Sequence, residues 1–194
     1  YSQDLSGGGR ANELRMESKL QDTVINMARN PSFEGEGSWA EINAAAGRSW
    51  AYSTTEKRSG SRSVAIEKTD AAAIMYGLRQ DYAVVKGRTY TASAYVKTAN
   101  MEADNGGAIL GLYCYDANGA YIRYYSHQVD INETWQQLAV TAEIPADTAV
   151  ETMRLYLYVE NQGTAYFDDV QVEYADGQSR FNYIRNGDFE YEME

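Results

Sequence analysis

Two adjacent carboxylic acids, Asp168 and Asp169, are the residues whose types and spacing come nearest to catalytic chemistry. A pair of carboxyl groups can hydrolyse a glycosidic bond when the two groups flank that bond. Successive residues of a strand point to opposite faces, so this pair cannot stand on both sides of one bond. Cys114 alternates with Leu110 and Leu112, which predicts a core position and not a nucleophile. We therefore predict that the chain is not itself an enzyme, although it could be part of a larger enzyme or surface protein.

Composition and charge exclude several other functions. The chain has 194 residues, a net charge of −11 and a pI near 4.6. Because binding to phosphate backbones requires clustered Lys and Arg, we expect no nucleic-acid partner. No apolar run reaches the roughly 18 residues of a spanning helix, so we expect no membrane insertion. The acidity favours solubility of an exported protein, and the single cysteine excludes an internal disulfide.

The aromatic residues offer a different chemistry, the recognition of a sugar. The chain has 17 Tyr and only 4 Phe, and rings with a polar hydroxyl suit half-exposed faces. Sugars present apolar C–H faces and a rim of hydroxyls, so a binder needs flat rings beside planar polar groups. The candidate ligand-binding residues are Trp50, Tyr52, Tyr95, Tyr113, Tyr115, Tyr125, Arg154 and Tyr156. The alternative for each tyrosine is cross-strand packing on a solvent face, and Arg154 could simply stack on a ring.

These side chains must be positioned by strands. Residues 89–98, 108–115 and 153–159 alternate between apolar and other side chains, which predicts strands with one face in the core. In the last of these, Met153, Leu155, Leu157 and Val159 are expected to face inward, and Arg154, Tyr156 and Tyr158 outward. Further strands are expected at 64–66, 72–76, 121–129, 137–143 and 165–173, with a turn at 116–119. Many short strands without a long helical pattern predict an all-β sandwich or barrel.

An internal repeat divides the chain into modules. Residues 26–34 and 182–190, which start 156 positions apart, share Asn, Arg, Asn, Phe and Glu at matching positions. A period this long indicates an array of whole domains. We therefore expect one module at residues 26–175, followed by a linker and the start of the next repeat at 176–194. Residues 1–25 are expected to be a linker or the tail of a preceding module, with a short helix at 11–21 as the alternative.

Four motifs give this module a resemblance to a known family. They are Asn30-Pro31-Ser32-Phe33-Glu34 followed by Trp39, Ser59-Gly60-Ser61-Arg62-Ser63-Val64, Asn132-Glu133-Thr134-Trp135-Gln136-Gln137-Leu138, and Tyr166-Phe167-Asp168-Asp169-Val170-Gln171-Val172-Glu173. In this order they resemble carbohydrate-binding modules of families 4, 9 and 22. The resemblance implies a galactose-binding-like jelly roll, a β-sandwich of two antiparallel sheets whose concave sheet binds a glycan. It also implies core positions for Trp39 and Trp135, and a tandem array like those of Gram-positive bacterial surface proteins.

The same resemblance implies a structural calcium ion that ties the first strand to the last. Its ligands would be the carboxylates of Glu34 and Asp168 and backbone carbonyls of Ser32, Ser59 and Arg62. This donor set suits calcium, which takes six to eight oxygen ligands. Asp169 replaces Asp168 if the register is off by one. The alternative is that these acids are solvated or hydrogen-bonded surface groups.

The leading functional prediction is therefore a non-catalytic carbohydrate-binding module with a poly- or oligosaccharide ligand and neighbouring modules of the same chain as partners. The expected location is extracellular, either secreted or attached to the cell wall. One alternative is a structural spacer or adhesion module with no glycan ligand, and a second is a module that binds protein or peptide. The spacer predicts a flat or filled concave face. The glycan binder predicts that Tyr95, Tyr113, Tyr156 and Arg154 converge on one open cleft.

Overall fold

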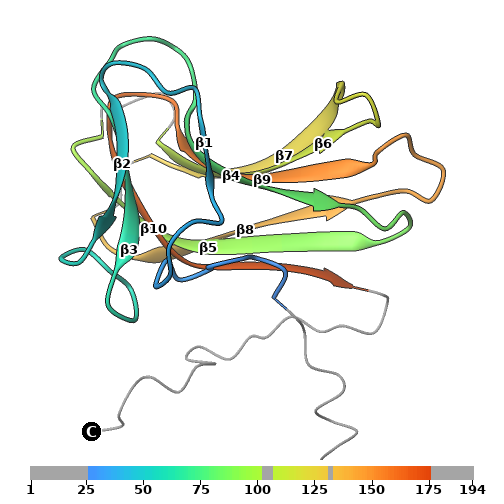
Figure 1. Cartoon of the computed structure of the whole chain (residues 1–194), viewed down its shortest axis with the longest axis horizontal. Coiled ribbons are helices and arrows are strands. Elements are labelled where there is room, and N and C mark those ends of the chain that lie inside the picture. The colour runs from blue at the N-terminus through green and yellow to red at the C-terminus, as the bar shows by residue number, and fades with distance from the viewer. Residues whose placement is uncertain (1–25, 102–106, 131–132, 176–194) are drawn as a thin grey trace, which may run out of the picture.

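The chain folds as a sandwich of two stacked antiparallel sheets (Figure 1). The computed structural model describes residues 26–101, 107–130 and 133–175. Within these ranges all regular structure is strand. The predicted all-β jelly-roll sandwich of two antiparallel sheets is confirmed. The repeat at residues 182–190 and the expected linker at 1–25 lie outside the described residues.

Each sheet has five strands within the described ranges. The first sheet has the order β1-β4-β9-β6-β7, and the second has the order β2-β3-β10-β5-β8. The strands are β1 (Ala40–Ile42), β2 (Arg48–Ser53), β3 (Ser63–Lys68), β4 (Tyr76–Ala83), β5 (Thr89–Ala99), β6 (Ala108–Tyr115), β7 (Tyr121–Val129), β8 (Gln136–Glu143), β9 (Thr152–Val159) and β10 (Gly163–Ala175). Every pair of neighbouring strands is antiparallel. The strand order also puts strands distant in sequence side by side, such as β10 between β3 and β5.

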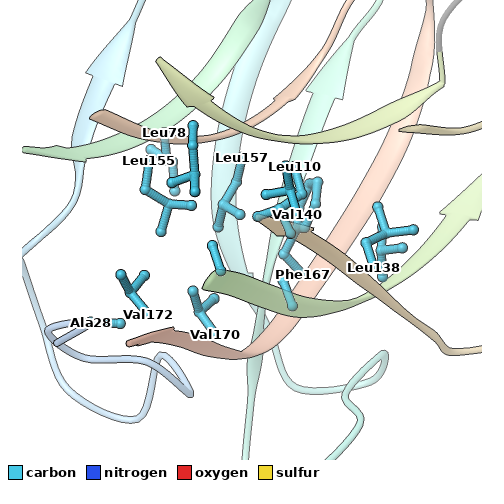
Figure 2. Packing of buried hydrophobic residues seen from close by; sticks show 14 of the residues in the cluster. Ala28, Leu78, Leu110, Leu138, Val140, Leu155, Leu157, Phe167, Val170 and Val172 are labelled. Atoms are coloured by element: carbon cyan, nitrogen blue, oxygen red, sulfur yellow. The ribbon is translucent and has the colours of Figure 1, made fainter. Parts of the chain in front are cut away.

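The core fills the space between the two sheets (Figure 2). The first sheet contributes Leu78, Leu110 and Leu157, and the second contributes Val140 and Phe167. Alternation along β9 holds as predicted, because Met153, Leu155, Leu157 and Val159 are all fully buried in this cluster. Burial of one such aliphatic side chain contributes about 1.5–3 kcal/mol. Removal of apolar surface from water is therefore what fixes the inward face of each strand.

The segment before β1 is held against β10 by backbone contacts. The Met27 amide donates to the Val172 carbonyl at 2.7 Å, and the Val170 amide donates to the Pro31 carbonyl at 2.9 Å. Phe33 is fully buried and stacks on Trp39 at a centroid distance of 5.3 Å. Trp39 is half-buried and packs against the core, as predicted. Trp135 is also half-buried, but it is not in the core cluster, so its predicted core position is wrong.

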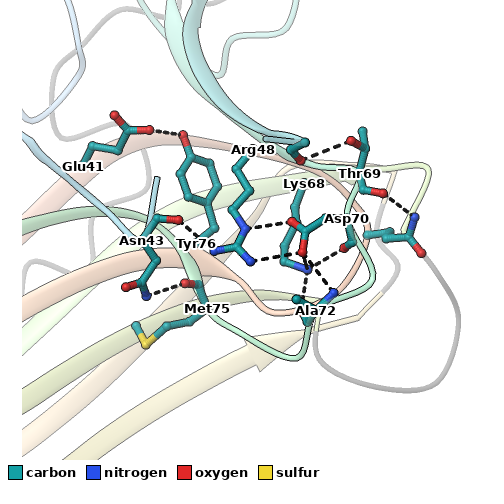
Figure 3. A network of polar contacts seen from close by, with 11 residues as sticks. Glu41, Asn43, Arg48, Lys68, Thr69, Asp70, Ala72, Met75 and Tyr76 are labelled. Atoms are coloured by element: carbon teal, nitrogen blue, oxygen red, sulfur yellow. Dashed lines mark hydrogen bonds and ion pairs between the residues drawn. The ribbon is translucent and has the colours of Figure 1, made fainter. Parts of the chain in front are cut away.

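The predicted strand at 72–76 is wrong, because β4 begins only at Tyr76. In the loop before β4, side chains form hydrogen bonds with backbone groups (Figure 3). The Lys68 ammonium donates to the Asp70 carbonyl at 2.6 Å and to the Ala72 carbonyl at 2.7 Å. The Asp70 carboxylate accepts the Ala72 amide at 3.0 Å and forms a two-point pair with Arg48. The apolar residues at 72–74 therefore lie in an exposed loop that polar contacts hold in place.

No described residue belongs to a helix long and apolar enough to cross a membrane.

Candidate functional site

The outer face of the first sheet, which points away from the core, carries four of the eight candidate ligand residues. Strand pairing places them in rows that run across the sheet. One row has Asp81 on β4, Arg154 on β9, Tyr113 on β6 and Tyr124 on β7. The neighbouring rows contain Arg79, Tyr156 and Gly111 on one side, and Thr152, Tyr115 and Tyr121 on the other. Each strand supplies alternate residues to this face because side chains alternate along a strand.

Six tyrosines on this face form a contiguous cluster, called here the tyrosine cluster: Tyr113, Tyr115, Tyr121, Tyr124, Tyr156 and Tyr158. Tyr113 lies at its centre. Its ring is stacked on Tyr124 with centroids 5.2 Å apart, and it meets Tyr156 edge-on at 4.9 Å. The hydroxyls of Tyr113 and Tyr158 lie 3.0 Å apart, and those of Tyr115 and Tyr156 lie 3.2 Å apart. These contacts hold the rings in fixed orientations.

The cluster has a buried layer and an exposed layer. Tyr156 and Tyr158 are only 6% and 2% exposed, whereas Tyr121 and Tyr124 are 53% and 55% exposed. Burial raises the pKa of Tyr115 to about 12, and it also raises the pKa of Tyr113 and Tyr158. These phenols therefore remain neutral at ordinary pH. Tyr156 and Tyr158 support the surface from beneath, and Tyr121 and Tyr124 expose ring area to solvent.

Gly111 makes room for the central ring. A Cβ atom at Gly111 would lie 2.8 Å from a ring carbon of Tyr113. The Tyr113 ring therefore leans back along its own strand over the glycine, into the space beside Tyr156 and Tyr158. A larger residue at position 111 would force this ring to shift.

A polar group adjoins the aromatic cluster on the β4 side. The guanidinium of Arg154 lies 4.1 Å from the centroid of the Tyr115 ring, which is a cation–π contact. The Nε atom of Arg154 is 3.3 Å from Asp81 Oδ2, and Arg79 Nε is 3.7 Å from Asp81 Oδ1. The face therefore combines flat rings with planar donors, which is the combination needed to hold a sugar.

The structure divides the predicted ligand residues into two groups. It brings Tyr113, Tyr115, Arg154 and Tyr156 together on the outer face of the first sheet. It does not bring Tyr95 to them, because Tyr95 is on β5 of the second sheet, where Arg58 lies 4.0 Å from its ring centroid. The expected convergence of Tyr95 with the other three residues is therefore wrong.

The three remaining candidates also lie elsewhere. Tyr125 is opposite the buried Leu112, packs against the core and donates its hydroxyl to the Glu143 carbonyl on β8 at 3.2 Å. Trp50 and Tyr52 belong to β2, an edge strand of the second sheet, and meet edge-on at 5.7 Å while packing against the core.

A bulge explains why the sequence pattern missed the exposed rings. Simple alternation along β7 puts Tyr121 on the same side as Tyr125. The structure pairs Arg123 with Cys114 but Tyr121 with Tyr115, so Ile122 is an extra residue in β7. This extra residue shifts Tyr121 to the opposite face, where its ring contacts Tyr113, Tyr115 and Tyr124. The position of Tyr124 beside Tyr113 depends on the pairing of β7 with β6, and periodicity within one strand cannot show which strands are paired.

The predicted metal ligands gather at a second place, around the loop at residues 58–62. The Glu34 carboxylate accepts the backbone amides of Ser61 and Arg62 at 2.8 and 3.0 Å, and also the Ser61 hydroxyl. The Asp168 carboxylate accepts the amides of Arg58 and Ser59 at 2.9 and 3.1 Å. One loop therefore binds both predicted carboxylates, on either side of Gly60.

Asp168 and its neighbour Asp169 have different surroundings. Asp168 is fully buried, and this burial, together with the Asp169 charge, raises its pKa to about 7. Asp169 pairs with the Arg58 guanidinium at 2.8 Å and accepts the Ser32 hydroxyl at 3.2 Å. Asp169 has a positive φ of 47° within the bulge of β10, a strained conformation for a non-glycine residue.

The fold and the aromatic outer face define a jelly-roll β-sandwich of the binding-module class. The sequence profile of the family described as "Carbohydrate binding domain" (CBM_4_9) matches residues 25–164. This match covers well over half of the chain, and the protein therefore belongs to this family. The resemblance inferred from the four motifs is confirmed at the level of the family. No curated protein sequence matches the chain.

Solved structures share the fold at low sequence identity. The first family 22 xylan-binding domain of Xyn10C from Paenibacillus barcinonensis is 18% identical, with a TM-score of 0.57, and the match covers 74% of this chain and 91% of that domain. The C-terminal family 22 module of Xyn10B from Clostridium thermocellum is 22% identical, with a TM-score of 0.56, over 78% and 93% of the two chains. Tailspike protein 4 of bacteriophage CBA120 is 13% identical, with a TM-score of 0.60; the match covers 78% of this chain and 22% of the tailspike chain.

Proposed function

We propose that this module binds a poly- or oligosaccharide on the outer face of the first sheet, without catalysing a reaction on it. The observation that carries the proposal is the exposed pair Tyr121 and Tyr124, whose rings pack on the half-buried Tyr113. Tyr113 in turn packs on the buried Tyr156 and Tyr158. Membership of the carbohydrate-binding family supports a sugar as the ligand. The fold relatives are described as xylan-binding, which makes xylan the first ligand to test.

The proposed mode of binding follows from the two layers of the cluster. The sugar rings lie on Tyr121, Tyr124 and the open part of Tyr113, where removal of apolar C–H surface from water stabilises the complex. Arg154 donates to sugar hydroxyls from the β4 side of the cluster. Tyr156 contacts no sugar and orients Tyr113 and Tyr115, since it is nearly fully buried beneath them.

The spacer alternative is favoured by one observation, the close packing of Tyr156 and Tyr158 under the other rings. A face filled only for stability would not need two further rings that are more than half exposed to water. The two readings differ in whether the exposed rings carry binding energy.

Binding to soluble xylan and to a panel of other plant and microbial polysaccharides tests the proposal. Affinity electrophoresis identifies the ligand, and calorimetry gives the dissociation constant. Tyr121→Ala and Tyr124→Ala should each weaken binding roughly fivefold, since a ring contact is worth about 1 kcal/mol. Tyr174→Ala is the matched control, because Tyr174 is a 41% exposed tyrosine on the second sheet. If no polysaccharide binds, or if Tyr121→Ala and Tyr124→Ala bind like the control, the proposal is wrong.

We also propose a structural calcium ion at the loop 58–62, held by Glu34 and Asp168 with backbone carbonyls of Ser32, Ser59 and Arg62. A fully buried Asp168 with a raised pKa fits a site that needs a cation to stabilise the carboxylate. Within the described ranges, no three His, Cys, Asp or Glu side chains gather to hold a metal ion. The ion would therefore depend on carbonyl oxygens, which calcium accepts readily. When bound, it would link the segment before β1 to β10.

An extracellular location, secreted or attached to the cell wall, follows from the proposed ligand, because structural polysaccharides lie outside the cell membrane. Fractionation of producing cells with an antibody against the module tests this, and recovery of the protein only from the cytoplasm contradicts it.

A further inference from the structure

Two guanidinium groups share a single carboxylate beside the tyrosine cluster. Arg79 and Arg154 both lie against Asp81, on adjacent strands β4 and β9. Asp81 is the only Asp or Glu at an outward position on the described strands of this face. The group therefore carries an excess of one positive charge, on a chain whose net charge is −11.

The pairing in this group is loose. In the two-point pair formed by Arg48 and Asp70, Nε–Oδ2 is 2.7 Å and Nη2–Oδ1 is 3.1 Å. The Asp81 contacts of Arg79 and Arg154 are longer, at 3.7 and 3.3 Å, and the Nε–H of Arg154 makes no hydrogen bond. Charge-assisted guanidinium–carboxylate bonds normally lie at about 2.7–2.9 Å. Asp81 therefore forms no close pair with either arginine, and the buried Nε–H of Arg154 has no hydrogen-bond partner.

Both arginines border the cluster and are open to solvent. Arg154 covers the Tyr115 ring, and Arg79 is in register with Tyr156. Their side chains are 25% and 32% exposed. Beside them the face carries the exposed small residues Ala40, opposite Arg79, and Ala83, which follows on β4. There is therefore room for a ligand group that reaches from the rings to the guanidiniums.

The opposite end of the cluster differs in charge. Glu160 lies near Tyr158 and Tyr113. Burial is the largest cause of the raised pKa of both phenols, and the negative charge of Glu160 raises it further. A ligand lying along the cluster would thus meet positive charge near β4 and negative charge beyond the end of β9. An acidic sugar fits only the first end.

We propose that Arg79 and Arg154 form a subsite for a carboxylate-bearing sugar, a uronic acid unit in or on the polysaccharide. This inference rests on the proposed function, because it assigns the ligand's charge on the same face. The guanidiniums bind the uronate oxygens through paired N–H donors, while the neighbouring sugar rings lie on the tyrosines. In the free protein Asp81 partly offsets the repulsion between the two guanidiniums, and it competes with the uronate for the same N–H donors.

The test compares two xylo-oligosaccharides of equal backbone length, one unsubstituted and one carrying glucuronic acid, by calorimetry on the whole chain. The substituted ligand should bind about tenfold more tightly. Arg79→Gln and Arg154→Gln should each remove most of this preference while binding to the neutral ligand falls less. Lys97→Gln is the matched control, because it removes the same charge from the second sheet. Thermal unfolding confirms that each variant is folded.

A third variant should increase the preference for the acidic ligand. Asp81→Asn removes the competing carboxylate, so the preference for the acidic ligand should rise several-fold. The preference of the natural protein should disappear at about 1 M NaCl, where the screening length is about 3 Å.

The outcomes separate this inference from the proposed function. Equal affinity for both ligands, or a preference that survives in Arg79→Gln and Arg154→Gln, overturns the acidic subsite and leaves sugar binding intact. Absence of binding to both ligands and to the polysaccharide panel overturns both proposals. A preference that Asp81→Asn lowers would also contradict the acidic subsite.

Discussion

Lys68 shows how one buried charge fixes a loop next to the candidate site. Its side chain is fully buried, and its ammonium donates to the carbonyls of Asp70 and Ala72 and lies 3.5 Å from the Asp70 carboxylate. Asp70 in turn pairs with Arg48, and the Arg48 hydrogen bond holds the pKa of Asp70 far below its usual range. The loop ends at Met75 (Figure 3). Met75 packs against the cluster that contains Tyr156 and Tyr158.

Replacement of Lys68 by methionine tests this role. Lys68→Met keeps the apolar stem but leaves the carbonyls of Asp70 and Ala72 without their donor, which should lower the free energy of unfolding by about 2 kcal/mol. Lys97→Met, which removes a more exposed cation paired with Glu56, should cost about 0.5 kcal/mol. Urea denaturation measures both values. Equal small losses in the two variants would contradict a structural role for Lys68.

At the scale of the strand, β7 serves two purposes with alternate side chains. Tyr124 faces the tyrosine cluster, and Tyr125 faces the second sheet, where its hydroxyl donates to Glu143 on β8. His127 lies on the same side as Tyr125, with Nδ1 3.0 Å from the Ala139 carbonyl oxygen. These two side chains join the edge strands of the sheets, so β7 closes the sandwich and also carries the proposed binding surface.

The two faces of β7 should respond differently to loss of a hydroxyl. Tyr125→Phe should lower the free energy of unfolding by about 1 kcal/mol, because the hydrogen bond to β8 is lost. It should not change sugar affinity. Tyr124→Phe keeps its ring and should change stability by less than about 0.5 kcal/mol. Thermal or urea unfolding of the two single variants decides this, and an equal effect would mean that Tyr125 does not join the sheets.

For the molecule as a whole, the proposed calcium ion would link three distant parts of the chain: residues 32–34, residues 58–62 and Asp168. At a calcium concentration of about 100 times Kd, the unfolding temperature should rise by roughly 5–10 °C. An ion that binds only the folded state raises the free energy of unfolding by about 2.7 kcal/mol at this concentration. A chelator should reverse the shift. Asp168→Asn should abolish the response to calcium, whereas Asp81→Asn should keep it. Unchanged melting with calcium and with chelator would eliminate the site.

Alkaline pH should also unfold the molecule cooperatively. Burial raises the pKa of Tyr115 to about 12 and raises the pKa of Tyr76, Tyr82, Tyr113 and Tyr158 above its usual value. The folded state therefore holds phenolic protons that the unfolded state releases near pH 10. The resulting stability is fully present below pH 10 and is lost as the pH rises toward and beyond 12. Tyrosinate absorbance and circular dichroism should change together; ionisation of all tyrosines near pH 10 without unfolding would contradict this.

The sequence by itself determined the all-β class, most strand positions, the inward faces of β5, β6 and β9, and the outward direction of Arg154, Tyr156 and Tyr158. These features follow from alternation of period two, a local property that residues such as Leu155 and Leu157 report directly. The motifs at residues 30–34 and 166–173 also indicated the family, because the resemblance depends on residue types in order along the chain.

Only the tertiary structure decided which strands are neighbours, and therefore which side chains share a face. Tyr95 alternates correctly along β5, yet it belongs to the other sheet. The bulge at Ile122 moves Tyr121 to the cluster, and the pairing of β4 with β9 brings Asp81 to Arg154. Pairing between strands far apart in sequence depends on the packing of the whole core. A periodic pattern within one strand carries no information about its neighbours, and one extra residue reverses its faces.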